Sequence, residues 1–257
     1  MRIPCAIIFN RFITPLYTKN WRIIEQNIFS LSDILLKLNK YSKYNKAILY
    51  YVNQSDNRPF NRGGMKNIGF KIVKDMYPME YNDITLIFND VDCMPFNKGL
   101  LDYDTRRGEI KHFYGVKDTL GGIVSITGHD FERINGYSNF WTWGLEDNIL
   151  QDRALKNNLR INRSNFFNLL DKNILHLMHG FDRKVLNKDI NKYINSKADG
   201  LNDIKDLNYE INGEMCDIIN FNTKENAPTM NELKTHDVRE RLIKRNNNKL
   251  KMNLSFN

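Results

Sequence analysis

The chain has 257 residues, of which 41% are hydrophobic and 12% aromatic, and its formal net charge is +8. This length suffices for one well-buried domain and is short for two of ordinary size. The apolar content argues against a disordered chain, and no apolar run approaches the about 20 residues that cross a bilayer. Three widely spaced cysteines favour free thiols in a reducing compartment over a disulfide framework.

The positive charge is concentrated toward the C-terminal end. From Asn231 onward, seven lysines and arginines face three acidic residues. A basic excess is one signal of nucleic-acid binding, but its gathering in one terminal segment argues against that as the main function. We expect residues 231–257 to form a basic segment, helical or frayed, with a solvated surface; contact with an anionic surface is the alternative.

Apolar patterning predicts alternating strands and helices over the first 90 residues. Buried strands are expected at Ala6–Phe9, Ala47–Val52 and Ile84–Phe88. Helical spacing predicts helices at Trp21–Leu38, with Thr18 as its N-cap, and at Asn61–Met76. This alternation predicts an α/β fold with a mainly parallel central sheet flanked by helices.

Beyond this region the alternation loosens. Glu146–Leu159 is expected to be a helix, and neither an internal repeat nor a linker is evident. The short apolar start lacks the long apolar region and cleavage site of a signal peptide, so it is interpreted as the first strand. We therefore expect a single domain over residues 1–257.

Two carboxylates, Asp90 and Asp92, directly follow the third expected strand. Ligands collect at the carboxyl ends of strands in open α/β sheets, and alternation in an extended segment sends both side chains the same way. Like charges that close need a cation, and a hard divalent ion is the usual one. The alternative is a turn with solvated carboxylates, because two aspartates at this spacing are common by chance.

Two of the five histidines, His176 and His179, lie three residues apart in an apolar context. Imidazole completes carboxylate sites for ions of the Mn²⁺ type, so these residues are candidate metal ligands. The alternative is one core histidine bonded to a backbone carbonyl and one surface histidine.

The segment Phe140–Asp147 reads FWTWGLED. Its tryptophan rings offer flat apolar faces that suit sugars, and Gly144 lets the backbone bend. Glu146 and Asp147 supply carboxylates for hydrogen bonding to an acceptor and for proton abstraction. The alternative is a tryptophan cluster in the core, followed by a helix whose first turn favours acidic residues.

In their order along the chain, these segments resemble the β-1,4-galactosyltransferase family. Phe60–Phe70 (FNRGGMKNIGF) and Phe88–Pro95 (FNDVDCMP) look like the family's F-N-R-x-x-x-x-N-x-G-F and F-x-D-V-D-x-x-P blocks. Further family blocks are matched, in the same order, by Gly121–Ser125, Ile134–Tyr137, Trp141–Asp147, His179–Lys184 and Ala198–Asn202.

The resemblance implies a GT-A-type glycosyltransferase fold and an inverting, Mn²⁺-dependent hexosyltransferase with a UDP-sugar as donor. By this likeness the metal ligands would be Asp92, His179 and His176, the last at a position where many relatives carry methionine. The residues implied in donor binding are Phe60, Arg62, Asp90, Val91, Gly122, Trp143, Gly144 and Arg11, the last in a segment that departs from the family's nucleotide motif.

The same likeness implies that Asp147 is the general base and that Glu146 positions the acceptor, a glycan or glycoconjugate. Acceptor contacts would come from Trp141, Glu146 and Asn148. Trp143 and Gly144 would belong to a mobile loop that closes over the donor and the metal.

Several positions depart from the family. Thr142 and Leu145 replace glycines, so we expect a stiffer loop, and Asn148 replaces an acidic residue that touches the acceptor in relatives. Thr119 precedes the glycine pair where galactosyl-specific members carry a tyrosine. A smaller side chain there would admit a 2-acetamido group, so UDP-Gal, UDP-GalNAc and UDP-GlcNAc all remain candidate donors.

The sequence also leaves alternatives. The family's membrane anchor and cysteine pattern are missing, which favours a cytoplasmic enzyme of viral or bacterial origin. A catalytically inactive relative that binds glycans or nucleotide sugars is the main alternative, and the joint presence of Asp92, His179 and Asp147 argues against it. A phosphatase with an aspartate nucleophile would carry Thr or Val where this chain has Met94.

Overall fold

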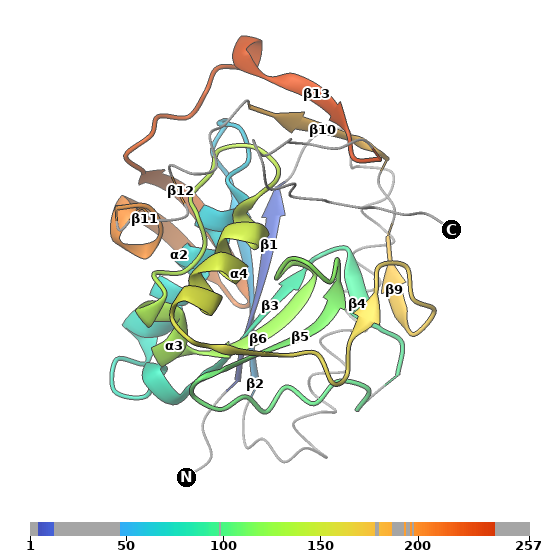
Figure 1. Cartoon of the computed structure of the whole chain (residues 1–257). Coiled ribbons are helices and arrows are strands. Elements are labelled where there is room, and N and C mark those ends of the chain that lie inside the picture. The colour runs from blue at the N-terminus through green and yellow to red at the C-terminus, as the bar shows by residue number, and fades with distance from the viewer. Residues whose placement is uncertain are drawn as a thin grey trace.

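The computed structural model describes residues 5–12, 47–97, 99–177, 180–186, 193, 196 and 198–239, with 5–12 and Ala47 described by their backbone. The main sheet is nine-stranded and mixed. Its strands are β1 Cys5–Phe12, β2 Ala47–Gln54, β3 Thr85–Asp90, β5 Glu109–Gly115, β6 Ile123–Thr127, β7 Arg160–Asn162, β8 Phe167–Asn168, β11 Lys205–Asn212 and β12 Met215–Asn222. They follow the order β11-β12-β2-β1-β3-β6-β5-β7, with β8 paired to β5. Figure 1 labels the strands of this order from β11 to β5.

The strands predicted around Ala6–Phe9, Ala47–Val52 and Ile84–Phe88 are confirmed as β1, β2 and β3. These strands and β12 are mutually parallel. The expectation of a mainly parallel sheet is confirmed, since β7 and β8 also pair in parallel with β5. Antiparallel pairs occur beside these: β6 with β3 and β5, and β11 with β12. Short connections allow this: residues 116–122 join β5 to β6, and Gly213 and Glu214 join β11 to β12.

Among the described residues, three α-helices cover one face of the sheet: α2 Arg62–Met76, α3 Gly128–Arg133 and α4 Glu146–Lys156 (Figure 1). α2 confirms the helix predicted over Asn61–Met76, and α4 confirms the one predicted from Glu146, although it ends before Leu159. The predicted helix at Trp21–Leu38, with Thr18, lies outside the described residues. Within the described part of the chain, none of the helices combines the length and apolar character that spanning a membrane requires.

Two further pairs of strands lie beside the main sheet: β4 Cys93–Pro95 with β9 Ile174–His176, and β10 Asp182–Val185 with β13 Lys234–Asp237 (Figure 1). Short 3₁₀ turns complete the described elements, η2 Tyr81–Asp83, η3 Leu201–Asp203 and η4 Met230–Glu232. The C-terminal segment was expected to be helical or frayed. In its described part, residues 234–237 form a strand instead, because β10 supplies an antiparallel partner.

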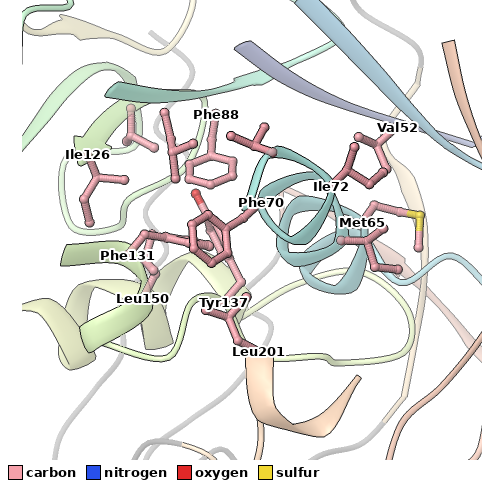
Figure 2. Close-up of a cluster of buried hydrophobic side chains, with 14 of the residues drawn as sticks. Val52, Met65, Phe70, Ile72, Phe88, Ile126, Phe131, Tyr137, Leu150 and Leu201 are labelled. Atoms are coloured by element: carbon pink, nitrogen blue, oxygen red, sulfur yellow. The ribbon is translucent and has the colours of Figure 1, made fainter. Parts of the chain in front are cut away.

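The core divides into two clusters, one on each face of the sheet. Alternation along β2 sends Tyr50 and Val52 toward the helices, and Leu49 and Tyr51 to the opposite cluster. Figure 2 shows the helix-side cluster, where the rings of Phe88, Phe131 and Tyr137 come together from β3, α3 and the loop after α3. The centroids of the Phe88 and Phe131 rings are 4.6 Å apart. Each such buried aromatic side chain contributes about 1.5–3 kcal/mol.

Helix α2 is fixed at both ends by local sequence. At its start, the Asn61 Oδ1 accepts a hydrogen bond of 2.8 Å from the Gly64 N–H. At its end, Pro78 follows Tyr77 and disfavours further helical backbone. Gly63 lies so close to the loop before α4 that a Cβ there would be 1.9 Å from the Ser138 carbonyl oxygen. The start of α2 is therefore held tightly against the loop that leads into α4.

We expect Gly63→Ala to lower the free energy of unfolding by about 1–3 kcal/mol, because the added methyl group forces these two segments apart. Urea denaturation followed by circular dichroism measures this. Asp75→Ala, at an exposed position of the same helix, is the control and should stay within about 0.5 kcal/mol of the parent. Equal stability of the two variants would contradict the packing described here.

Candidate functional site

Arg62, the first residue of α2, contacts three carboxylates from two other elements. Its Nη2 donates to the two carboxylate oxygens of Asp90, the last residue of β3, at 2.6 and 2.5 Å. Its Nη1 donates to Asp147 Oδ2 at 2.7 Å and to the Glu146 carboxylate, both in the first turn of α4. A guanidinium presents its donors in a rigid planar fork, so this one side chain fixes the end of β3 relative to the start of α4.

Lys66 lies one turn further along α2 and adds a second cation beneath the same carboxylates. Its Nζ is 3.3 Å from Asp90 Oδ1 and 3.5 Å from Asp147 Oδ1, and its side chain is 1% exposed. The ammonium also lies 4.6 Å from the ring centroid of Tyr137. Lys66 was not among the site residues predicted from the sequence. The available signal was a lysine four residues after Arg62, on a helix face otherwise made of glycine and apolar residues.

The charges in this cluster shift one another's ionisation. Burial raises the pKa of Asp90, but the charges of Arg62 and Lys66 outweigh it, so this pKa lies below its usual range. Burial lowers the pKa of Arg62, but Asp147, Asp90 and Glu146 together raise it well above its usual value. The stabilisation from Asp90 is therefore fully present above its unfolded pKa of about 4, and is lost as pH falls through the lower folded pKa.

The metal-ligand candidates Asp92 and His176 are brought together by the pairing of β4 with β9. Cys93 pairs with His176 in this small sheet, and the Leu177 N–H donates to the Asp92 carbonyl oxygen at 2.7 Å. As a result, His176 Nε2 lies 4.0 Å from Asp92 Oδ2. The turn between β3 and β4 is braced by the Asn89 side chain, which donates to the carbonyl oxygens of Asp90 and Cys93 at 2.7 and 2.8 Å.

A divalent cation fits this pair of donors. Two atoms that each lie about 2.1 Å from one ion are between about 3 and about 4.2 Å apart, and the Asp92–His176 separation falls inside that range. One carboxylate oxygen and one imidazole nitrogen suit an ion of the Mn²⁺ type. Among the described residues no group of three such ligands is found, and the third candidate, His179, lies outside them.

The Gly121–Gly122 pair joins Asp90 to Asp147. The Asp90 N–H donates to the Gly122 carbonyl oxygen at 2.9 Å, and a Cβ on Gly121 would lie 2.4 Å from Asp147 Oδ2. The Gly121 carbonyl oxygen accepts from the buried His112, whose Nε2 lies 3.0 Å away. Burial and then the Arg163 charge lower the pKa of His112 to about 4, so its ring is neutral at pH 7.

The segment with Trp143 lies against the β10–β13 pair. The Trp143 N–H donates to the Lys184 carbonyl oxygen at 3.1 Å, and its ring stacks on His236 with 6.1 Å between centroids. Thr142 and Leu145 both have φ of 77°, a left-handed conformation that costs a non-glycine residue about 1–3 kcal/mol. These are the two positions at which the resemblance puts glycines, so the chain keeps the glycine-like backbone without the glycines.

Several predicted donor-site residues lie around this cluster. The Phe60 carbonyl oxygen accepts from the Thr142 N–H at 2.8 Å, so Phe60 borders the Trp143 segment. Val91 lies in the turn after β3 and packs against the second core cluster. Gly144 is buried within the Trp143 segment. Arg11 follows Asn10, whose backbone pairs with Asp90, so it lies at the same edge of the sheet.

The predicted acceptor residues are more deeply buried than expected. Trp141 is 3% exposed, stacks on Phe221, and donates its indole N–H to Thr223 Oγ1 and the Glu225 carbonyl oxygen. It belongs to the core and offers no ring face to a sugar. Glu146 and Asn148 are 2% and 5% exposed, and α2 packs against this first turn of α4 through Arg62 and Gly63.

Comparison with known proteins shows similarity to galactosyltransferases. A family model described as the N-terminal domain of galactosyltransferase matches residues 108–180. The xylosylprotein 4-beta-galactosyltransferase of Caenorhabditis elegans is 30% identical over 175 residues, which cover 62% of this chain and 58% of that protein. The chain is similar to enzymes of the β-1,4-galactosyltransferase family. The β-1,4-galactosyltransferase 7 of Drosophila melanogaster is 31% identical over 160 residues, covering 58% of this chain and 47% of that protein.

The solved structures agree with a galactosyltransferase fold. The catalytic domain of Drosophila β-1,4-galactosyltransferase 7, solved with xylobiose, aligns with a TM-score of 0.65 at 19% identity, covering 87% of this chain and 95% of that one. A mutant of that enzyme, solved with manganese, UDP-Gal and xylobiose, aligns with a TM-score of 0.62 at 18% identity and the same coverage. The predicted GT-A-type α/β class is thereby confirmed. The chain spans about half the length of the curated relatives it matches.

We expect Arg62→Met to lower the free energy of unfolding by about 3–5 kcal/mol at pH 7, because three partly buried carboxylates lose their shared partner. The difference in free energy of unfolding between Arg62→Met and the parent should narrow as pH falls below about 4, because the stabilisation from ionised Asp90 is lost there. Urea denaturation at several pH values measures both effects.

Arg107→Met is the matched control, because Arg107 forms an ion pair with Asp83 in which both side chains are 52% exposed. Its loss should change the free energy of unfolding by less than about 1 kcal/mol. If both variants lower the free energy of unfolding by the same amount at pH 7, the Arg62 cluster does not stabilise the fold more than a surface ion pair does.

Proposed function

We propose that this chain is a member of the β-1,4-galactosyltransferase family and a metal-dependent, inverting glycosyltransferase. It moves a hexose from a UDP-sugar to a hydroxyl group of a sugar acceptor. The observation that carries the proposal is the meeting of Asp147, Asp90 and the Asp92–His176 pair at one edge of the sheet, with Arg62 joining the first two. Carboxylates at the ends of strands face the ligand crevice in folds of this kind.

In this proposal Asp147 is the general base. Its carboxylate takes the proton of the acceptor hydroxyl as that oxygen attacks the anomeric carbon, and the bond from that carbon to the diphosphate breaks. Arg62 and Lys66 hold the Asp147 carboxylate from one side. Because Gly121 has no side chain, the Oδ2 atom of Asp147 can lie against its backbone. Much of the rate enhancement that a general base provides comes from its being held in the right position and orientation.

Asp92 and His176 would hold the cation, together with His179 if the family pattern is kept. When bound, a divalent ion offsets the negative charge that develops on the departing diphosphate. Manganese is the ion present in the complex of the Drosophila enzyme, and its ligand preferences match an oxygen and nitrogen donor set. Asp90, Val91 and Arg62 would then line the donor side, with Phe60, Gly122 and Arg11 near the nucleotide.

The Trp143–Gly144 segment would cover the donor. Its contacts to Lys184 and His236 link it to the β10–β13 pair. Opening and closing of the Trp143–Gly144 segment would therefore also move this pair of strands. Glu146 is ion-paired with Arg62 and buried. A role of Glu146 or Asn148 in acceptor binding therefore requires the start of α4 to become more exposed than it is in this structure. The sugar transferred is a hexose, with UDP-Gal, UDP-GalNAc and UDP-GlcNAc as candidate donors, because Thr119 and Leu120 stand before the glycine pair where galactosyl-specific relatives carry a tyrosine.

Asp147→Asn should lower Mn²⁺-dependent turnover at least 10²-fold, because an amide cannot accept the acceptor's proton. The assay is UDP release from a panel of UDP-sugars, with and without Mn²⁺, across sugar acceptors. Asp152→Asn, on the same helix, is the control and should retain activity. If no UDP-sugar is transferred or hydrolysed in a metal-dependent way, the chain is an inactive relative that only binds its ligands. If the chain binds nucleic acid with an affinity that falls with salt and does not need metal, its ligand is a nucleic acid instead.

Both His176→Met and His176→Ala should bind Mn²⁺ more weakly than the parent, since a thioether is a poorer ligand than imidazole for this ion and a methyl group is none. Equilibrium titration with Mn²⁺ gives the dissociation constants. His129→Ala is the control, because His129 is 40% exposed on α3. Unchanged affinity in both His176 variants would remove this residue from the metal site.

A further inference from the structure

We infer that Tyr114 is a positioning residue for the metal site: its hydroxyl group orients the His176 imidazole so that Nε2 faces Asp92. The inference rests on the proposed function, because it assumes that Asp92 and His176 share a cation. The Tyr114 Oη lies 2.8 Å from His176 Nδ1, the ring nitrogen directed away from Asp92. The centroids of the two rings are 5.8 Å apart.

A bulge in β5 directs Tyr114 to this position. The register between β5 and β6 shifts between His112 and Tyr114. In a regular strand Phe113 and Tyr114 would point to opposite faces of the sheet, yet both belong to the core cluster on the side of β4 and β9. Bulges re-aim side chains in this way and are frequent beside functional sites.

The bulge is itself held by a buried side chain. His112 Nε2 lies 3.0 Å from the Tyr114 carbonyl oxygen and 3.0 Å from that of Gly121. Its other ring nitrogen, Nδ1, accepts from Arg163 Nε at 3.0 Å, which leaves the proton on Nε2. The same histidine therefore supports both Tyr114 and the glycine turn beside Asp147.

The hydroxyl group of Tyr114 is fixed on its other side as well. The Leu170 N–H donates to Tyr114 Oη at 3.0 Å, so this oxygen is anchored to the backbone between β8 and β9. A hydroxyl oxygen can accept a second hydrogen bond, from His176 Nδ1–H, and this tautomer leaves the Nε2 lone pair for a cation. Partners of this kind fix the tautomer and ring orientation of metal-binding histidines, and their loss typically weakens metal binding 10–100-fold.

The test is Mn²⁺ binding by the full chain, read from the electron paramagnetic resonance signal of the free ion. Tyr114→Phe, which removes only the hydroxyl group, should raise the dissociation constant about 10-fold. Tyr81→Phe removes a hydroxyl that is bonded to Glu132 elsewhere, and it should leave the constant unchanged. Circular dichroism and thermal melts verify that both variants are folded.

A double-mutant cycle separates positioning from a general structural effect. In a His176→Ala background, Tyr114→Phe should have no further effect on the dissociation constant, because the residue acts through the imidazole. An unchanged constant in the single variant, or an equal loss in the His176→Ala background, would overturn the role of Tyr114. A wild-type chain that binds no Mn²⁺ would overturn the metal site and with it this role, which is a distinct result.

If Tyr114→Phe does not fold, the tautomer can be read in the wild-type chain. Long-range ¹⁵N–¹H spectra with Zn²⁺, a diamagnetic substitute, distinguish the two ring nitrogens of His176. A protonated Nδ1 with the metal on Nε2 would support the inference. Metal on Nδ1, or no change of His176 on metal addition, would overturn it.

Discussion

A single guanidinium, that of Arg62, joins the end of a central strand to the start of a helix that follows it by more than 50 residues. Its hydrogen bonds to Asp90, Glu146 and Asp147 counter the mutual repulsion of three carboxylates that the fold brings together. Lys66 supplies the second cation from the same helix. Gly63 lets the start of α2 lie close to the loop before α4. This close packing brings the side chains of Arg62 and Lys66 within reach of the carboxylates.

The second half of the site depends on strand pairing. Asp92 and His176 are far apart in the chain, and the register of β4 with β9 makes them neighbours. The bulge in β5 then brings the Tyr114 hydroxyl behind the imidazole. The residues proposed to have chemical roles therefore lie at strand and helix ends, and the sheet supplies a rigid support for them.

Local patterns predicted much of this arrangement. Asp90 and Asp92 follow an apolar strand, Arg62 starts a capped helix, and Glu146 and Asp147 start another, and each depends on residues near in sequence. The antiparallel strands, the burial of Trp141 in the core and the roles of Lys66 and Tyr114 depend on contacts between distant segments. The periodicity of apolar residues does not reveal contacts between distant segments. In the sequence, a lysine or tyrosine that will be buried cannot be told from one on the surface until its partners are known.

The most direct test of the account is a crystal structure of the chain with UDP and Mn²⁺, with the metal located by its anomalous scattering. The account predicts one strong peak within bonding distance of Asp92 and His176 Nε2, with the diphosphate on the same side as Asp90 and the base Asp147 across the sugar site. A metal bound elsewhere, or a nucleotide away from the end of β3, would contradict it.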